Sequence, residues 1–207
     1  MRGADEMTAD ELARRLDRLR ADLEHTRADY EQIMVHLAGL SSTVTDQTKR
    51  RALELFVTVV ATDYELKVLL LRDLSDPTDR EVWEKYLALL SWAAIEELPP
   101  RISSEYREAG RAFKDALKPI KSDADDMTNL TEIRNRVVAH RDLEGGDHWL
   151  AQWHLAAIAN KHNGRSVLQS RIVAHTGTIL NALRALGTAI RDRHPDVLPQ
   201  RASSADG

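Results

Sequence analysis

A regular spacing of apolar residues near the start of the chain is the feature that most constrains its fold. From Thr8 to Leu40, residues that are nearly all apolar recur at alternating spacings of four and three positions. This spacing places them on one side of an α-helix, so the segment is predicted to be one long helix with a narrow apolar seam. The seam consists of Leu12, Leu16, Leu19, Leu23, Thr26, Tyr30, Ile33 and Leu37. It can pack lengthwise on the rest of the chain or pair with a second copy as a coiled coil, and both possibilities stay open.

Helical periodicity continues along the rest of the chain, and prolines and glycines divide it into further segments. These further helices are predicted at Thr45–Leu74, Thr78–Leu98, Arg101–Leu117, 122–145, Trp149–Asn160 and Ser166–Arg193. Pro119 is expected to end the fourth helix of the chain, because proline lacks the N–H that a helix interior needs. Ser166 is expected to cap the last helix.

The absence of any strand pattern or internal repeat predicts an all-α fold, a bundle of helices. At 207 residues the chain is long enough for one well-packed domain. We therefore expect a single domain over residues 1–194 and a flexible polar tail over residues 195–207. The long first helix, residues 8–38, could protrude from that domain.

Charge and composition limit the classes of function. The chain has no cysteine, which excludes disulfides and thiolate metal or redox chemistry. Its net charge of −4 is unlike that of a protein that coats nucleic acid, although it is compatible with a local basic patch. No run approaches the roughly 20 apolar residues that a membrane span needs, and the polar N-terminus lacks a signal-peptide core. We expect a cytoplasmic protein with no membrane contact.

One short motif concentrates the chemically useful side chains: Arg134-Asn135, four further residues, and then His140. On an α-helix at about 100° per residue, Arg134 and His140 would lie about 120° apart around the axis and roughly 9 Å apart along it. One straight helix cannot aim both side chains at one point. Two copies that face each other across a two-fold axis can, with the arginine of one chain meeting the histidine of the other.

This motif resembles the signature of the HEPN superfamily, which is an arginine, four to six residues and a histidine, often with asparagine directly after the arginine. The stretch from residue 134 to residue 142 is most similar to the abortive-infection branch. Proteins of this superfamily are small helical bundles, and many are metal-independent endoribonucleases that act as toxins or abortive-infection effectors. Some members carry a tyrosine two positions after the histidine, where this chain has Asp142.

The resemblance implies that Arg134, Asn135 and His140 are catalytic residues. Cleavage of RNA without a metal needs a proton to leave the 2′-hydroxyl, a proton to reach the 5′-oxygen, and positive charge beside the phosphorane. An imidazole suits the proton transfers, and a guanidinium suits the charge because it binds phosphate with parallel hydrogen bonds. Asn135 can orient the histidine or a phosphate oxygen. Arg136 competes with Arg134 for the phosphate, and Arg141 is a candidate substrate contact.

The predicted helix from Arg101 carries a row of basic residues at helical spacing. Its members are Arg107, Arg111, Lys114 and Lys118. Such a row is either a solvated helix face or a short path for an RNA backbone. Nearby acidic residues, which could neutralise part of it, are Glu105, Glu108 and Asp115.

No pattern predicts a metal site or a cofactor. His148 and His154 are six positions apart and do not share a helix face, and His162 falls in a predicted turn. There is no glycine-rich phosphate loop and no serine elbow for acyl transfer. The tryptophans are expected in the core or at an interface rather than as base-stacking platforms. They are Trp83, Trp92, Trp149 and Trp153.

The sequence therefore predicts a homodimeric, metal-independent endoribonuclease of HEPN type that cuts single-stranded RNA. It would act as a toxin or an antiphage effector, with an antitoxin or another regulatory protein as a further candidate partner. Two alternatives stay open. The bundle could be a non-catalytic HEPN-like binding or assembly module, or a plain helical scaffold in which the motif is a coincidence.

Overall fold

The computed structural model describes residues 9–40, 44–75, 80–138, 156–161 and 164–198. No strand occurs within these ranges, which confirms the all-α prediction. The elements are α1 Ala9–Leu40, α2 Gln47–Ser75, α3 Arg80–Glu96, η1 Pro99–Arg101, η2 Ser104–Tyr106, α4 Arg107–Ser122, α5 Ala124–Glu132, η3 Ile133–Val138 and α7 Arg165–Arg193. The short segments η1 and η2 are 3₁₀ turns, η3 is π-helical, and residues 156–161 are α-helical.

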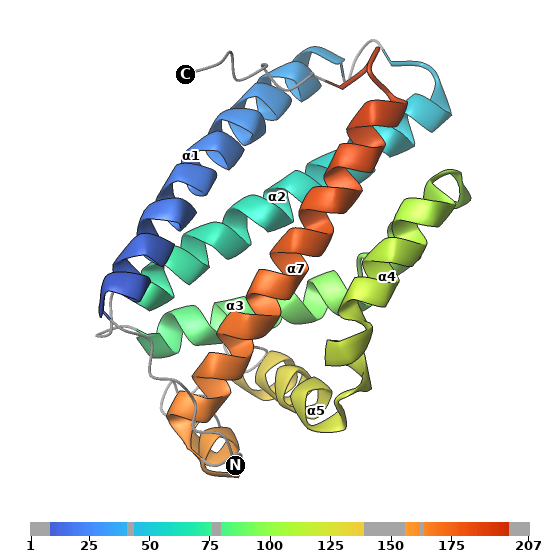
Figure 1. Ribbon diagram of the computed structural model, residues 1–207. Helices are drawn as coiled ribbons and strands as arrows, with labels where there is room; N and C mark the ends of the chain where they lie inside the picture. Colours follow the sequence, from blue (N-terminus) through green and yellow to red (C-terminus); the bar gives the residue numbers. More distant parts are fainter. Residues whose placement is uncertain (1–8, 41–43, 76–79, 139–155, 162–163, 199–207) are drawn as a thin grey trace, which may run out of the picture.

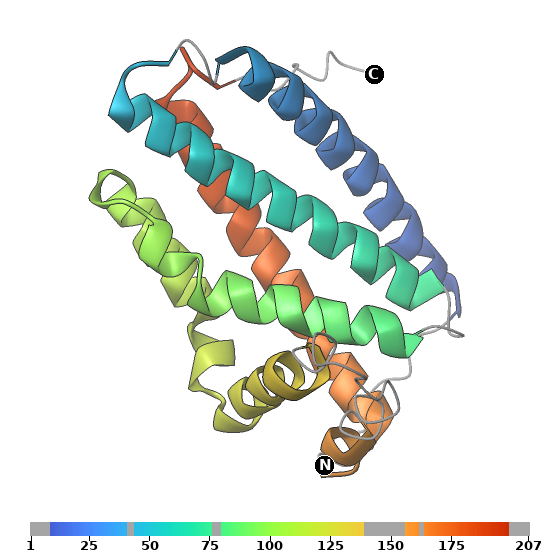
Figure 2. The ribbon, with the colours of Figure 1, turned by 180° about the vertical axis from the view of Figure 1, so that it is seen from behind.

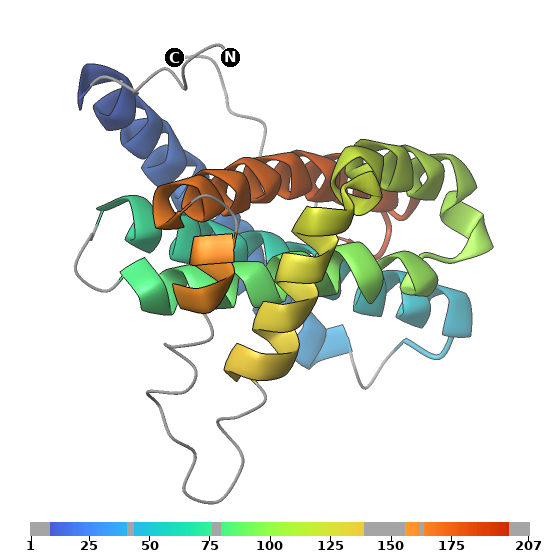
Figure 3. The same ribbon diagram turned by 90° about the horizontal axis from the view of Figure 1, so that it is seen from below.

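Helix α7 is the centre of the bundle. It packs on α2, α3 and α4, and α1 packs on the side of α2 (Figure 1). Seen from behind, α2 lies between α1 and α3 (Figure 2). Seen from below, α5 crosses α3 at the lower end of the bundle (Figure 3). No helix within the described ranges is long and apolar enough to span a membrane.

The core forms where the apolar faces of the helices meet α7. The residues of α7 that face inward are Ile172, Ile179, Leu183, Leu186 and Ile190, and all are buried. Helix α7 approaches α2 closely at Gly187, where an added Cβ would lie 3.4 Å from Val59 Cγ1. Burial of aliphatic surface, at roughly 25 cal/mol per Å², is the main favourable contribution to such a bundle.

The apolar seam of α1 packs lengthwise on α2 of the same chain. Thr26 and Ile33 are buried there. The ring of Tyr30 stacks on the ring of Tyr64, with centroids 5.1 Å apart and planes inclined by 7°. Of the two arrangements that the seam allows, the described chain adopts packing within one chain.

A charged network joins α1, α2 and α7, and no sequence pattern predicted it. The Lys67 ammonium lies 2.6 Å from Asp63 Oδ2 and 3.0 Å from Asp22 Oδ2, and it donates to Thr26 Oγ1. Arg184 of α7 binds the same oxygen of Asp22 at 2.6 Å. Burial raises the pKa of Asp63, and the nearby Lys67 offsets this only in part. Burial also raises the pKa of Asp22, but Lys67 and Arg184 together lower it by more. The net shift of the Asp22 pKa is therefore downward.

The predicted start of the fourth helix is wrong. The helix begins at Arg107 and not at Arg101, because Ile102 and Ser103 have an extended backbone between the 3₁₀ turns η1 and η2.

Two other predicted helix boundaries are wrong. Pro119 lies inside α4, which continues to Ser122. The proline is exposed, so water can bind the carbonyl that its missing N–H leaves free, and the buried Ile120 holds that turn on the core. Ser166 does not cap α7, because the N-cap is Gly164. Its φ of 104° is a backbone conformation that glycine adopts without strain.

The bundle also extends past the predicted domain boundary at residue 194. Val197 and Leu198 are 6 % and 2 % exposed, and the Val197 carbonyl accepts a hydrogen bond of 2.8 Å from His36 Nε2 on α1. Lys49 pairs with Asp196 in the same region. The prediction of a flexible tail is therefore wrong for residues 195–198, and residues 199–207 lie outside the described residues. The predicted helix end near residue 145 and the first part of the predicted helix 149–160 also lie outside them.

Candidate functional site

The helix that leads into the motif has a well-formed start. The Asp123 side chain accepts hydrogen bonds from the N–H groups of Asp125 and Asp126, at 3.0 and 3.1 Å, and so caps α5. The bond from the Asp126 N–H holds the pKa of Asp123 below its ordinary value, against a smaller effect of burial. The carboxylate also interacts favourably with the positive end of the helix dipole.

Directly after α5 the helix widens into the π-helical turn η3, which carries the first part of the motif. The assumption of about 100° per residue is therefore wrong for Ile133–Val138, because a π-helix bonds i to i+5. Leu130 and Ile133 are buried, and η3 packs on α3. π-helical turns are rare and occur frequently at functional sites.

Arg134 and Asn135 are exposed on η3 and contact each other. Arg134 Nη1 donates a hydrogen bond of 3.0 Å to Asn135 Oδ1. The Arg134 guanidinium carbon lies 4.3 Å from the centre of the Trp92 ring, which belongs to α3. These two contacts fix the guanidinium plane while leaving it at the surface, an arrangement that suits binding of a phosphate.

The structure describes only part of the predicted site. His140, Arg141 and Asp142 lie outside the described residues, and of Arg136 only the backbone is described. His148, His154, His162, Trp149 and Trp153 lie outside as well. The pair Arg134 and Asn135 is thus brought together, whereas the distance from Arg134 to His140 stays a prediction.

Two interactions near the motif were missed from the sequence. Trp92 was expected to pack in the core or at an interface, and its half-buried ring also supports Arg134. Asp126, which is 6 % exposed, lies 2.7 Å from Arg171 Nη1 and 2.8 Å from His175 Nε2 on α7. The spacing of four between Arg171 and His175 marks a shared helix face in the sequence, but it does not reveal a partner on another helix.

The predicted basic row lies exposed along α4. The opposite face of α4 points to the core and carries the buried residues Phe113, Leu117 and Ile120. Among the described contacts, none joins the basic row to Arg134. The placement of the row at helical spacing is confirmed, and its role as a substrate contact stays a prediction.

No protein-family model matches this chain, and neither does any curated protein or solved structure. The functional interpretation therefore depends on the motif and on the contacts around it.

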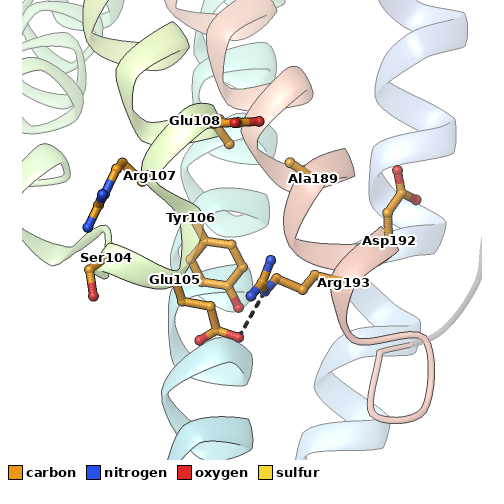
Figure 4. A pocket seen from close by; sticks show the side chains of 9 residues that line it. Ser104, Glu105, Tyr106, Arg107, Glu108, Ala189, Asp192 and Arg193 are labelled. Carbon is orange, nitrogen blue, oxygen red and sulfur yellow. Dashed lines mark hydrogen bonds and ion pairs between the residues drawn. The ribbon is translucent and has the colours of Figure 1, made fainter.

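A cavity of about 680 Å³ lies at the other end of the bundle, between the start of α4 and the end of α7 (Figure 4). Glu105 Oε1 lies 3.2 Å from Arg193 Nε and 2.9 Å from His194 Nε2 there. Burial, with a smaller effect of the Glu105 charge, raises the pKa of Tyr106 to about 12. Because its carboxylate is already engaged by Arg193 and lies beside His194, Glu105 is suited to a structural role.

Proposed function

We propose that the protein is a metal-independent endoribonuclease of HEPN type, acting in the cytoplasm as a toxin or antiphage effector. The proposal is supported chiefly by one observation: the motif arginine is exposed on a π-helical turn and is bonded to the asparagine that follows it. The motif supplies the rest of the chemistry, since His140 follows at the spacing typical of the superfamily. Single-stranded RNA is the proposed substrate.

In this proposal the positive charge of Arg134 stabilises the phosphorane. Its guanidinium is permanently ionised, and an edge of parallel N–H groups matches two phosphate oxygens. Asn135 orients the guanidinium through the hydrogen bond described above. His140 takes the proton of the 2′-hydroxyl or gives one to the departing 5′-oxygen, tasks that an imidazole can perform near neutral pH.

We place the complete site between two copies of the chain. Six positions separate Arg134 from His140, and the π-helical turn η3 covers Arg134 and the next four residues, so the spacing along the axis is not that of a regular α-helix. A single scissile phosphate is served more closely by residues from two facing motifs, related by a two-fold axis. The homodimer and any antitoxin or regulatory partner are parts of the same proposal.

Cleavage of labelled single-stranded RNA tests the function directly. The wild-type protein is expected to cut RNA in the presence of EDTA, and His140→Ala is expected to reduce the rate by at least about 100-fold, as expected for loss of a general acid or base. Arg134→Gln should also lose activity. Circular dichroism and thermal unfolding of both variants provide the control for folding. If a folded, dimeric wild-type protein cuts no RNA, the nuclease proposal fails.

A non-catalytic HEPN-like binding module is the second candidate. One observation favours it: Arg134 already has partners in Trp92 and Asn135 and could serve the fold alone. Growth of cells that express the protein separates the two candidates. A nuclease toxin should slow growth, and His140→Ala should restore it, whereas a binding module should give the same growth with either chain.

A further inference from the structure

A groove lies on one side of α4, and three residues of the basic row line it. A hollow of about 350 Å³ lies between the segment that contains η2 and the first half of α4. Arg107, Arg111 and Lys114 line it, and the fourth member of the row, Lys118, does not. We name this hollow the η2–α4 groove. Its volume lies in the range typical of small-molecule sites.

The cations of the groove are not neutralised by the fold. Within the described part of the chain, none of the three forms an ion pair, whereas Lys121 on the same helix pairs with Glu96 at 2.9 Å. Asp115 also lines the groove, so the lining keeps an excess of positive charge. Two further carboxylates lie near the start of α4. Glu105 is engaged by Arg193, and Glu108 lines the cavity of Figure 4 instead.

The opposite wall of the groove offers neutral donors. Ser103 and Ser104 are exposed, and the Ser103 side chain makes no capping hydrogen bond to η2. Tyr106 also lines the groove, but its ring packs edge-on against His194 and its hydroxyl lies beside Arg193 (Figure 4), so it is not one of these donors. Hydroxyl groups opposite a row of guanidinium and ammonium groups form a common arrangement for phosphate recognition.

The floor of the groove is fixed by a close approach of two segments. Gly110 lies against Ile102, and a Cβ added at residue 110 would lie only 2.9 Å from Ile102 Cγ2. A larger residue there would push the segment with the two serines away from α4. The glycine therefore holds the two walls at their present separation.

We propose that the η2–α4 groove binds phosphate groups of single-stranded RNA, with Arg107, Arg111 and Lys114 as charged contacts and Ser103 and Ser104 as hydroxyl donors. This inference rests on the proposed function and deepens it, because it places the RNA backbone on a defined part of α4. Phosphodiester oxygens carry the charge that three unpaired cations attract, and contacts of this kind do not depend on base sequence.

Binding of a fluorescein-labelled single-stranded RNA, followed by anisotropy over a range of salt concentrations, tests the groove. His140→Ala serves as the common background, so that cleavage does not disturb the measurement. Arg111→Gln and Lys114→Gln are each expected to weaken binding several-fold near 0.1 M salt and to lower the slope of log K against log salt by about 0.7. Lys121→Gln on the same helix is the matched control: its charge is already paired with Glu96 outside the groove, so it should change neither quantity.

Inorganic phosphate and a nucleoside monophosphate distinguish a free anion from an RNA chain as the source of the phosphate. If millimolar phosphate displaces the RNA from the protein but not from Arg111→Gln, the groove recognises phosphate. A far higher affinity for RNA than for free phosphate then shows that the RNA backbone is the ligand. Equal losses in Arg111→Gln and Lys121→Gln, or no binding of any probe, would overturn the inference. If Arg111→Gln, with His140 intact, cleaves RNA at the wild-type rate, the proposal for the groove fails and the nuclease proposal stands. If RNA binding depends on the groove but the wild-type protein does not cleave RNA, the nuclease proposal fails and the groove stands.

Discussion

The Lys67 side chain carries a charge that the fold removes almost completely from water. It is 3 % exposed and is compensated by Asp63, which is nearly as buried, and by Asp22 nearer the surface. Removing a charged group from water costs several kcal/mol, so the ammonium is stable there only because its partners are close. The network fixes α1, α2 and α7 relative to one another by directional bonds, in addition to apolar packing.

Replacing Lys67 by methionine should expose the cost of an unpaired carboxylate. Lys67→Met keeps the length of the side chain but leaves Asp63 buried without its cation, and we expect a loss of about 3 kcal/mol in the free energy of unfolding. The double variant Lys67→Met/Asp63→Leu should recover most of that loss, because it removes both charges. Urea unfolding measures both. A double variant no more stable than the single one would contradict this account.

At the scale of elements, sequence periodicity predicted the long helices, and local backbone chemistry was harder to predict. The seam of α1 identified a helix because α1 packs along its length on one neighbour, α2. The π-helical turn at Ile133 was not predicted, because it depends on how Leu130 and Ile133 settle against α3. Similarly, the contact of Trp92 with Arg134 joins separate helices and leaves no local pattern. In the candidate site, only the neighbouring pair Arg134 and Asn135 could be foreseen.

Glycines in two helices offer a matched test of close packing. Gly110→Ala in α4 should destabilise the protein by about 1–2 kcal/mol, because the new methyl would overlap with Ile102. Gly177→Ala in α7 is the control: an added Cβ meets nothing within 4 Å, so the better helix propensity of alanine should raise stability by up to about 1 kcal/mol. Thermal unfolding should show shifts of opposite sign. Equal shifts for the two variants would mean that Ile102 yields freely.

At the scale of the whole molecule, the segment after α7 is joined to the end of α1 and the start of α2. The hydrogen bond from His36 to the Val197 carbonyl connects the end of α1 to the segment after α7, and Lys49 at the start of α2 pairs with Asp196 there. The chain thus closes on itself at one end of the bundle, while the motif lies near α5 at the other (Figure 1).

Truncation tests how much the segment after α7 contributes. A chain that ends at residue 194 lacks Val197 and Leu198, whose burial is worth about 3 kcal/mol or more in total, and it should unfold at a clearly lower temperature. A chain that ends at Leu198 should unfold at the same temperature as the full-length protein. Identical unfolding of the two truncated chains would show that the segment adds nothing to stability.

The stacked rings of Tyr30 and Tyr64 have a consequence for stoichiometry. Tyr30 belongs to the seam that a zipper between two molecules would also need, so self-association through α1 would first have to pull that helix off its own bundle. Assembly by that route competes with folding instead of adding to it. The proposed homodimer would therefore form through some other surface, and substitutions on the outer side of α1 should not affect it.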